Sequence, residues 1–267
     1  MIRQPAVANR FYPGNPAELE RTVRQLLPGD STQARHAIGV VAPHAGYIYS
    51  GAMAGRTIGS VHVPSTVIIL GPNHHGRGAT AAVSTASWNM PNGVVPCAVD
   101  VAEALCARSS LLCEDEAAHA HEHSLEVQVP FLQALQPDLH IVAIAFSALQ
   151  YEACAEIARA LSAVIDASDR DILLLASTDM SHYESREAAT AKDTDALNHV
   201  LAMDPEGLYR TVLNRRISMC GFIPVTITLL AAMDLGAQKA ELIGYTDSGA
   251  VSGDTDQVVG YAGLVIR

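Results

Sequence analysis

Three apolar runs of the sequence are each followed within a few residues by side chains that bind metals or move protons: His44; His74 with His75; and Asp179 with His182. Neutral imidazole binds divalent transition metals, and two histidines with one anionic ligand leave coordination positions open for substrate or dioxygen. A histidine near its ordinary pKa also transfers protons at neutral pH. The repeated placement therefore predicts a metal or acid–base site. Only one of His74 and His75 need face it, because adjacent side chains in an extended turn diverge.

Two further segments carry candidate site residues. Residues 121–126 (HEHSLE) open a predicted helix, in which Ser124 is the expected N-cap and acidic residues suit the positive helix end. Cys220 precedes Gly221 and an apolar, helix-like run. A thiol at the start of a helix has a lowered pKa and is a good metal ligand or nucleophile.

These side chains need a scaffold that brings strand ends together. Buried strands are predicted at 38–42, 66–70, 140–146 and 172–176, and helices at 17–27, 52–61, 101–108, 125–135, 151–165 and 190–201. A last strand pair is expected near 239–245 and 258–266, around loop residues 247–254. The alternation over residues 1–267 predicts a single α/β domain around a central sheet. Such sheets bind ligands at the carboxyl ends of their strands, where the histidines fall.

The composition limits the class of protein. Charged residues make up 17% of the 267 residues, against the ~25% typical of soluble domains. The 17 Lys and Arg against 28 Asp and Glu leave a net charge of −11, which excludes a nucleic-acid binder that works through bulk positive charge. Five scattered cysteines without a CxxC pair exclude a disulfide framework and a structural zinc site.

Membrane and nucleotide signals are missing from the sequence. The amino terminus has no apolar signal core, and the longest uncharged stretch, 217–233, falls short of the ~20 apolar residues of a membrane span. We therefore expect a soluble, cytoplasmic protein without a membrane partner. Neither a glycine-rich nucleotide cradle nor a GxSxG nucleophile elbow occurs.

Six segments, in the same order as in a known family, carry a resemblance. They are RFYP (10–13), APHAGYIYSG (42–51), LGPNHHG (70–76), EHSLEVQVPFL (122–132), STDMSHY (177–183) and CG (220–221). On these segments the chain resembles the Memo family, the mediator-of-cell-motility homologues, over nearly its full length. One departure is Asn9, where the family more often has Gly.

The resemblance implies a fold similar to the class III extradiol ring-cleaving dioxygenases, in which two histidines and a glutamate hold Fe(II). Together with the alternation of strands and helices, it implies a mixed central sheet with helices on both faces. Carried over by motif, His44 and His74 match the histidine ligands, and Cys220 matches the position of the glutamate. His182 with Asp179 matches the acid–base region. The remaining expected cavity residues are His75, His123, Glu126 and Tyr47.

The implied cofactor is Fe(II) or copper, with zinc expected in some purified protein. Thiolate is a softer donor than carboxylate and biases a site toward copper, zinc or a thiolate–iron centre. The family resemblance also implies a functional link to a radical-SAM protein, while the small-molecule substrate and the oligomeric state stay open.

Three hypotheses follow. The first is a metal-binding protein with redox or oxygenase-like chemistry at His44, His74 and Cys220. The second is an active extradiol-type dioxygenase in which Glu126 or Asp179 supplies the missing carboxylate. The third is a binding module that holds a peptide or a phosphorylated ligand in the same cleft without turnover.

Overall fold

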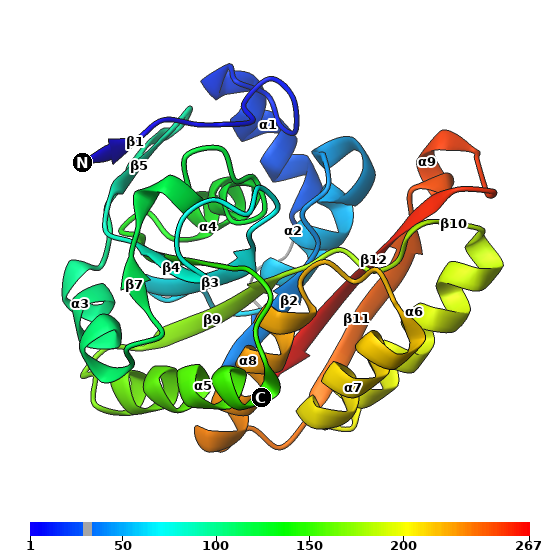
Figure 1. Ribbon diagram of the computed structural model, residues 1–267. Helices are drawn as coiled ribbons and strands as arrows, with labels where there is room; N and C mark the ends of the chain where they lie inside the picture. Colours follow the sequence, from blue (N-terminus) through cyan, green and yellow to red (C-terminus); the bar gives the residue numbers. More distant parts are fainter. Residues whose placement is uncertain (29–33) are drawn as a thin grey trace.

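The four apolar runs that the sequence predicts as strands form the parallel centre of one large sheet (Figure 1). The computed structural model describes residues 1–28 and 34–267. In order across the sheet, the central strands are β2 (Gly39–Ala42), β9 (Ile172–Ser177), β3 (Thr66–Pro72) and β8 (His140–Phe146). Every neighbouring pair among them is parallel. They are apolar almost throughout because parallel strands covered on both faces bury nearly every side chain.

Further strands extend this sheet on both sides, and antiparallel pairs among them confirm the predicted mixed sheet. On one side lie β12 (Val258–Ile266), β11 (Ala240–Asp247) and β10 (His182–Glu184), and on the other β4 (Ala81–Ser84) and β7 (Cys113–Glu114). β12 is antiparallel to β2, β10 and β11, and β4 is antiparallel to β8. Across residues 1–28 and 34–267, nine strands make up this sheet.

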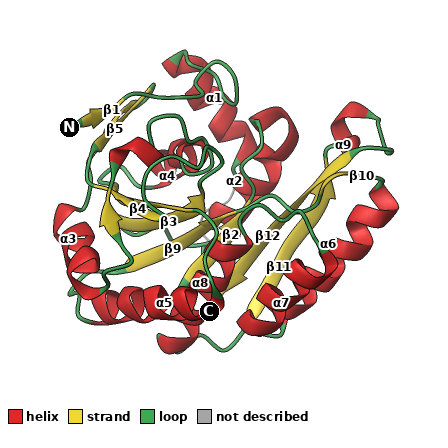
Figure 2. Cartoon of the chain, viewed as in Figure 1, coloured by secondary structure: helices red, strands yellow, loops and turns green. Residues whose placement is uncertain are grey.

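A smaller sheet lies near the amino terminus (Figure 2). Its strands are β1 (Ile2–Arg3), β5 (Ser87–Met90) and β6 (Gly93–Val95). The sequence analysis does not predict it, because strands of this length are too short to show an alternation of apolar and polar residues.

Adjacent residues of the central strands face opposite sides of the sheet, and each side has its own core. Ile69 of β3 joins the cluster formed with one set of helices, α1 (Pro16–Leu26), α2 (Ala52–Ile58) and α4 (Val129–Leu135). Ile68 joins the cluster formed with α3 (Val99–Arg108), α5 (Tyr151–Asp166) and α8 (Phe222–Asp234). A third cluster adds α6 (Arg186–Leu201) and α7 (Pro205–Arg215) beside α8. The predicted α/β class, with helices on both faces, is confirmed.

Two local predictions need correction. The helix expected at 125–135 begins as a 3-10 turn, Glu126–Gln128, and becomes α-helical only at Val129. Ser124 is not its N-cap, because its Oγ donates a hydrogen bond to the Pro72 carbonyl instead. α7 is a helix that the sequence analysis does not predict, although Asp204 caps it and Pro205 opens it.

Within the described part of the chain, none of the helices combines the length and the apolar character that crossing a bilayer requires.

Candidate metal centre

Parallel pairing of β2, β9 and β3 brings three strand ends to one edge of the sheet. His44 and His74 each lie two residues beyond the end of a strand, and Asp179 lies two residues beyond β9. Proline stops two of these strands, at Pro43 and Pro72, because it cannot donate to the ladder beyond that point. His44, His74 and Asp179, all predicted site residues, therefore lie at the same edge of the sheet, at the carboxyl ends of its strands.

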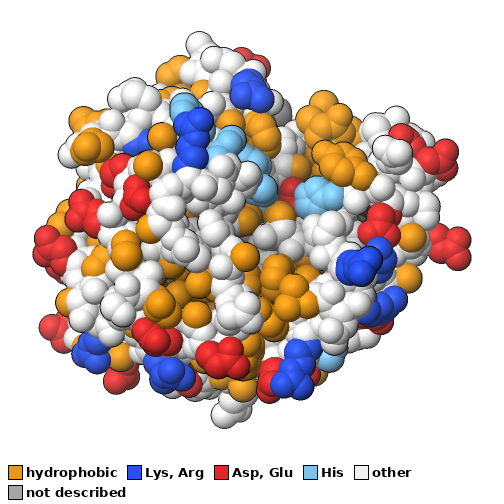
Figure 3. Space-filling model, viewed as in Figure 1, with side chains coloured by type: hydrophobic (Ala, Val, Ile, Leu, Met, Phe, Trp, Pro, Cys, Tyr) orange, Lys and Arg blue, Asp and Glu red, His pale blue; other side chains and the backbone are white. Residues whose placement is uncertain are grey.

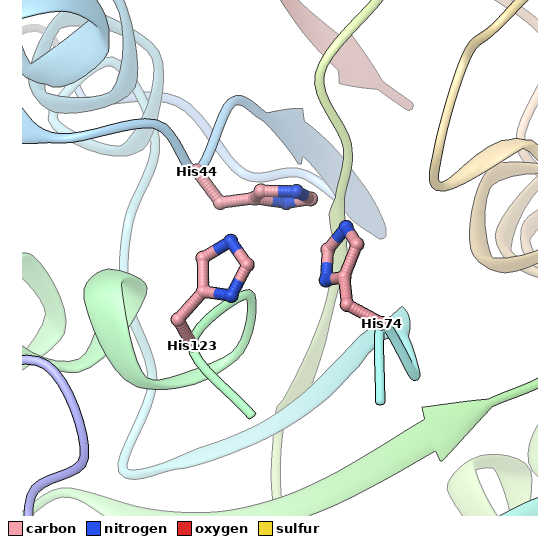
Figure 4. A group of neighbouring side chains, drawn as sticks. All are labelled: His44, His74 and His123. Carbon is pink, nitrogen blue, oxygen red and sulfur yellow. The ribbon is translucent and has the colours of Figure 1, made fainter. Parts of the chain in front are cut away.

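Three histidines form a compact group at this edge: His44, His74 and His123 (Figure 4). Each offers a ring nitrogen, and these three nitrogens all lie within 4.8 Å of one another. The ring centroids of His74 and His123 are 4.6 Å apart, and His44 lies 5.2 and 5.4 Å from them. The group could bind a metal ion. His123 comes from the loop before the 3-10 turn, a segment far from either strand end in the sequence.

The group is reached from one face of the molecule, where histidine side chains gather in a hollow (Figure 3). His44 is 2% exposed, whereas the side chains of His74 and His123 are 30% and 20% exposed. Burial holds the pKa of His44 well below its ordinary value and lowers that of His123 to about 4. Both rings are therefore neutral at pH 7, the form that binds metals.

The tautomer of His44 follows from its hydrogen bonds. Its Nδ1 lies 2.9 Å from Ser177 Oγ. The single hydroxyl proton of Ser177 goes to the Ser124 carbonyl at 2.6 Å, and Gln128 Nε2 donates to the same hydroxyl oxygen at 2.8 Å. Ser177 must therefore accept from His44, so that Nδ1 carries the proton and Nε2 keeps its lone pair.

The carboxylate of Glu122 lies against both His74 and His123. Its side chain is fully buried, and Oε1 lies 2.9 Å from His74 Nδ1 and 3.4 Å from His123 Nδ1. Burial of the Glu122 carboxyl opposes ionisation, but the hydrogen bonds from His74 and Ser124 outweigh it and hold its pKa well below its usual range. The sequence analysis missed Glu122, and its place between two histidines in HEH is the signal that could have found it.

Cys220 lies directly beside the group. Its Sγ is 3.2 Å from His44 Nε2 and accepts the Asp179 amide hydrogen at 3.2 Å. A Cβ on the next residue, Gly221, would lie 2.4 Å from the Ser177 carbonyl oxygen, so glycine is what allows this approach. Burial raises the pKa of the Cys220 thiol, which opposes the lowering expected at a helix start.

Asp179 and His182 make separate contacts. Asp179 Oδ1 accepts the His44 amide hydrogen at 2.7 Å, and burial raises the pKa of this carboxyl to about 6. His182 Nδ1 donates to the Ser218 carbonyl at 2.9 Å, which leaves its Nε2 unprotonated in the neutral ring.

The other three predicted cavity residues have their polar atoms engaged elsewhere or exposed. The Glu126 carboxylate accepts from Arg3 at 2.7 Å, from the Tyr12 hydroxyl at 2.6 Å and from two backbone amides. The buried Tyr47 hydroxyl donates to the Val127 carbonyl. His75 is exposed, and its ring neighbours that of His121 at 6.2 Å.

The RFYP segment also reaches the site. The Phe11 ring packs against His123 with centroids 4.7 Å apart, and the Tyr12 hydroxyl donates to Glu126, at the start of the 3-10 turn that follows. Asn9 adopts a φ of 64°, the left-handed conformation that glycine adopts without strain. Asparagine is among the few other residues that adopt this conformation readily.

These donors fit a transition-metal ion. Imidazole suits zinc, copper, iron and nickel, and metal-binding histidines are ordinarily held through their second ring nitrogen by a neighbouring group. His44 and His74 both have such a partner, Ser177 and Glu122. The fold and the histidine group together define an α/β protein with a candidate metal centre at the carboxyl edge of its sheet.

The family follows from comparison with known proteins. The Memo-like protein family matches residues 3–265, and the chain belongs to this family. Three relatives are MEMO1 family proteins of archaea: from Methanosarcina barkeri (37% identical, 100% of each chain covered), Methanopyrus kandleri (39%; 100% of this chain, 99% of the other) and Methanocaldococcus jannaschii (37%; 100% and 99%). The predicted family is thus confirmed.

A solved structure shares the fold. It is that of the uncharacterized protein JW3007 from Escherichia coli K12, which is 15% identical, with a TM-score of 0.53 over 83% of this chain and 98% of that one. This likeness concerns the fold alone.

Proposed function

We propose that the protein binds an iron or copper ion at the histidine group and uses it for redox or oxygenase-like chemistry on a small molecule. In this proposal His44 and His74 are ligands, and Cys220 and His123 are the neighbouring donors that complete the coordination. Zinc is expected in protein purified without added iron or copper, because the same imidazoles suit zinc.

The single observation that carries the proposal is the approach of three ring nitrogens to within 4.8 Å of one another. Packing alone gives no reason to gather three imidazoles with a ring nitrogen of each so close together, whereas a metal ion requires such an arrangement. The hydrogen bonds of Ser177 and Glu122 add support, since they orient His44 and His74.

An iron or copper ion bound here would supply Lewis acidity and electron transfer. The chain itself would contribute proton transfer. His182 has a free Nε2, since its Nδ1 is bonded to the Ser218 carbonyl, and is proposed to exchange a proton with the substrate. Asp179 holds the His44 backbone through its amide and acts as a positioning residue.

The hydrogen bonds of Glu126 argue against it as the carboxylate ligand of the dioxygenase hypothesis. Both oxygens of Glu126 already accept hydrogen bonds from Arg3, Tyr12 and backbone amides, so this carboxylate is not free to replace the missing glutamate. Asp179 is the remaining carboxylate candidate. The module that binds a peptide or a phosphorylated ligand stays an alternative hypothesis, and the link to a radical-SAM protein stays an expectation of the resemblance.

Anaerobic titration with Fe(II) and with copper tests the proposal. We expect one ion per chain, and loss of binding by more than about 100-fold in His44→Ala and His74→Ala, beyond the ~10–100-fold cost of losing a ligand's supporting partner. His62→Ala, which removes an exposed histidine, is the matched control. Equal binding by all four proteins would contradict the proposal.

A further inference from the structure

The carboxylate of Glu122 contacts two imidazoles of the histidine group and the backbone that carries them. Oε1 accepts from His74 Nδ1 at 2.9 Å, from the His123 amide at 2.9 Å and from the Ser124 amide at 2.8 Å. Oε2 accepts from the His74 amide at 2.6 Å. His123 Nδ1 lies 3.4 Å from Oε1. One side chain therefore links the loop after β3 to the loop before α4.

An ionised carboxylate accepts hydrogen bonds and donates none, so a ring nitrogen bonded to it must carry a proton. In a neutral imidazole the other nitrogen, Nε2, then has the free lone pair. Glu122 is 0% exposed, and its oxygens accept from backbone N–H groups, so the carboxylate is the acceptor and His74 Nδ1 the donor in their shared hydrogen bond. Ser177 fixes the His44 tautomer in the same way, because its hydroxyl oxygen accepts the hydrogen of His44 Nδ1.

We propose that Glu122 is the positioning residue of this centre: it fixes His74 in the tautomer protonated at Nδ1, which presents the Nε2 lone pair to the ion, and it holds the His123 backbone through its amide. The bonds to both loop backbones set the 4.6 Å spacing of the two rings. The consequence for metal affinity rests on the proposed function. The tautomer assignment does not, since it concerns the metal-free chain.

Long-range ¹H–¹⁵N spectra of the imidazoles in metal-free protein test the assignment. The variant His74→Gln identifies the signals of the His74 ring. We expect the His74 ring to be protonated at Nδ1 in the native chain, and Glu122→Gln to shift it toward the Nε2-protonated form that free imidazole side chains favour. A native spectrum with His74 protonated at Nε2 overturns the proposal, and this readout stands even if the Gln variant does not fold.

Metal titration of the same proteins supplies the second arm. Glu122→Gln should weaken Fe(II) or copper binding by about 10–100-fold, the usual cost of losing such a partner. Glu116→Gln is the matched control, because Glu116 also anchors a loop through Ser84 and two backbone amides but contacts none of the three grouped histidines. Unchanged affinity in Glu122→Gln, or an equal loss in both variants, contradicts the positioning role. If Glu122→Gln shifts the His74 tautomer but the native chain binds no metal, the assignment is supported and the proposed function is contradicted.

Discussion

The Sγ atom of Cys220 lies 3.2 Å from the Nε2 atom of His44, across a separation of 176 residues in the chain. The His44–Ser177 hydrogen bond leaves a free lone pair on this Nε2. In the absence of a metal, the Cys220 thiol therefore donates its hydrogen to His44 Nε2. An ion bound at His44 Nε2 would replace this hydrogen bond, and the Cys220 sulfur would then be a neighbouring donor for the ion. The pair therefore places a soft donor beside a group of three imidazoles.

The role of the third histidine can be separated from that of its neighbours by substitution. We predict that His123→Gln weakens both Fe(II) and copper binding, because its ring nitrogen belongs to the 4.8 Å group. His75→Gln should leave both affinities unchanged, since His75 is exposed. Isothermal titration under nitrogen measures the two. Equal affinities in the two variants would remove His123 from the coordination proposal.

Metal selectivity tests Cys220. Replacing Cys220 with Glu exchanges a soft sulfur for a hard oxygen, so the variant should prefer Fe(II) over copper more strongly than the native chain does. Glu is longer than Cys, and some crowding is expected in this packed region. We further expect that the native protein loaded with Fe(II) does not cleave simple catechols.

Anaerobic competition between the two metals, followed by metal analysis of the protein, measures the preference. An unchanged iron-to-copper ratio in Cys220→Glu would exclude Cys220 as a ligand.

The acid stability of the carboxyl-terminal region depends on Asp247. Arg186 donates two hydrogen bonds of 2.7 Å to this carboxylate and holds its pKa below its usual range. Because the folded-state pKa lies below the unfolded value of ~3.9, the ionised form stabilises the fold above that pH, and the effect is lost as the pH falls through the folded-state pKa.

Asp247→Asn should therefore lower the free energy of unfolding by about 1–2 kcal/mol at neutral pH and by progressively less as the pH falls below ~3.9. Urea unfolding over a pH series measures this. Asp256→Asn, an exposed neighbour in the same loop, is expected to stay within about 0.5 kcal/mol throughout. A constant penalty at every pH would contradict the ion-pair explanation.

Asn9 and Gly14 form a coupled pair in the amino-terminal turn. Asn9 has a φ of 64°, its Oδ1 accepts the Gly14 amide hydrogen, and a Cβ on Gly14 would lie 2.4 Å from the Asn9 side chain. Asn9→Ala should cost about 1 kcal/mol, whereas Asn9→Gly should be nearly neutral because glycine adopts this φ freely.

The coupling gives a sharper test. Gly14→Ala should destabilise the native chain by about 1 kcal/mol but cost little in an Asn9→Gly background, since the clashing side chain is then gone. Additive effects in this double-mutant cycle, measured by thermal or urea unfolding, would show that the clash is not the cause.

The sequence predicted the scaffold better than the contacts within it. The central strands, and with them the positions of His44 and His74, could be predicted because buried parallel strands are continuous apolar runs and their ends meet at one edge. Which side chain of HEHSLE turns inward depends on contacts between distant segments. Glu126 is held by Arg3, 123 residues away, and Glu122 by His74 in another loop. No local pattern reports such pairings.

Anomalous scattering from a crystal of the Fe(II)-loaded protein, recorded at the iron edge, tests the central claim most directly. We predict one iron peak among His44, His74 and His123, within bonding distance, roughly 2.0–2.2 Å, of at least two imidazole nitrogens. A fully loaded protein whose iron peak lies elsewhere, with these three rings unchanged, would contradict it.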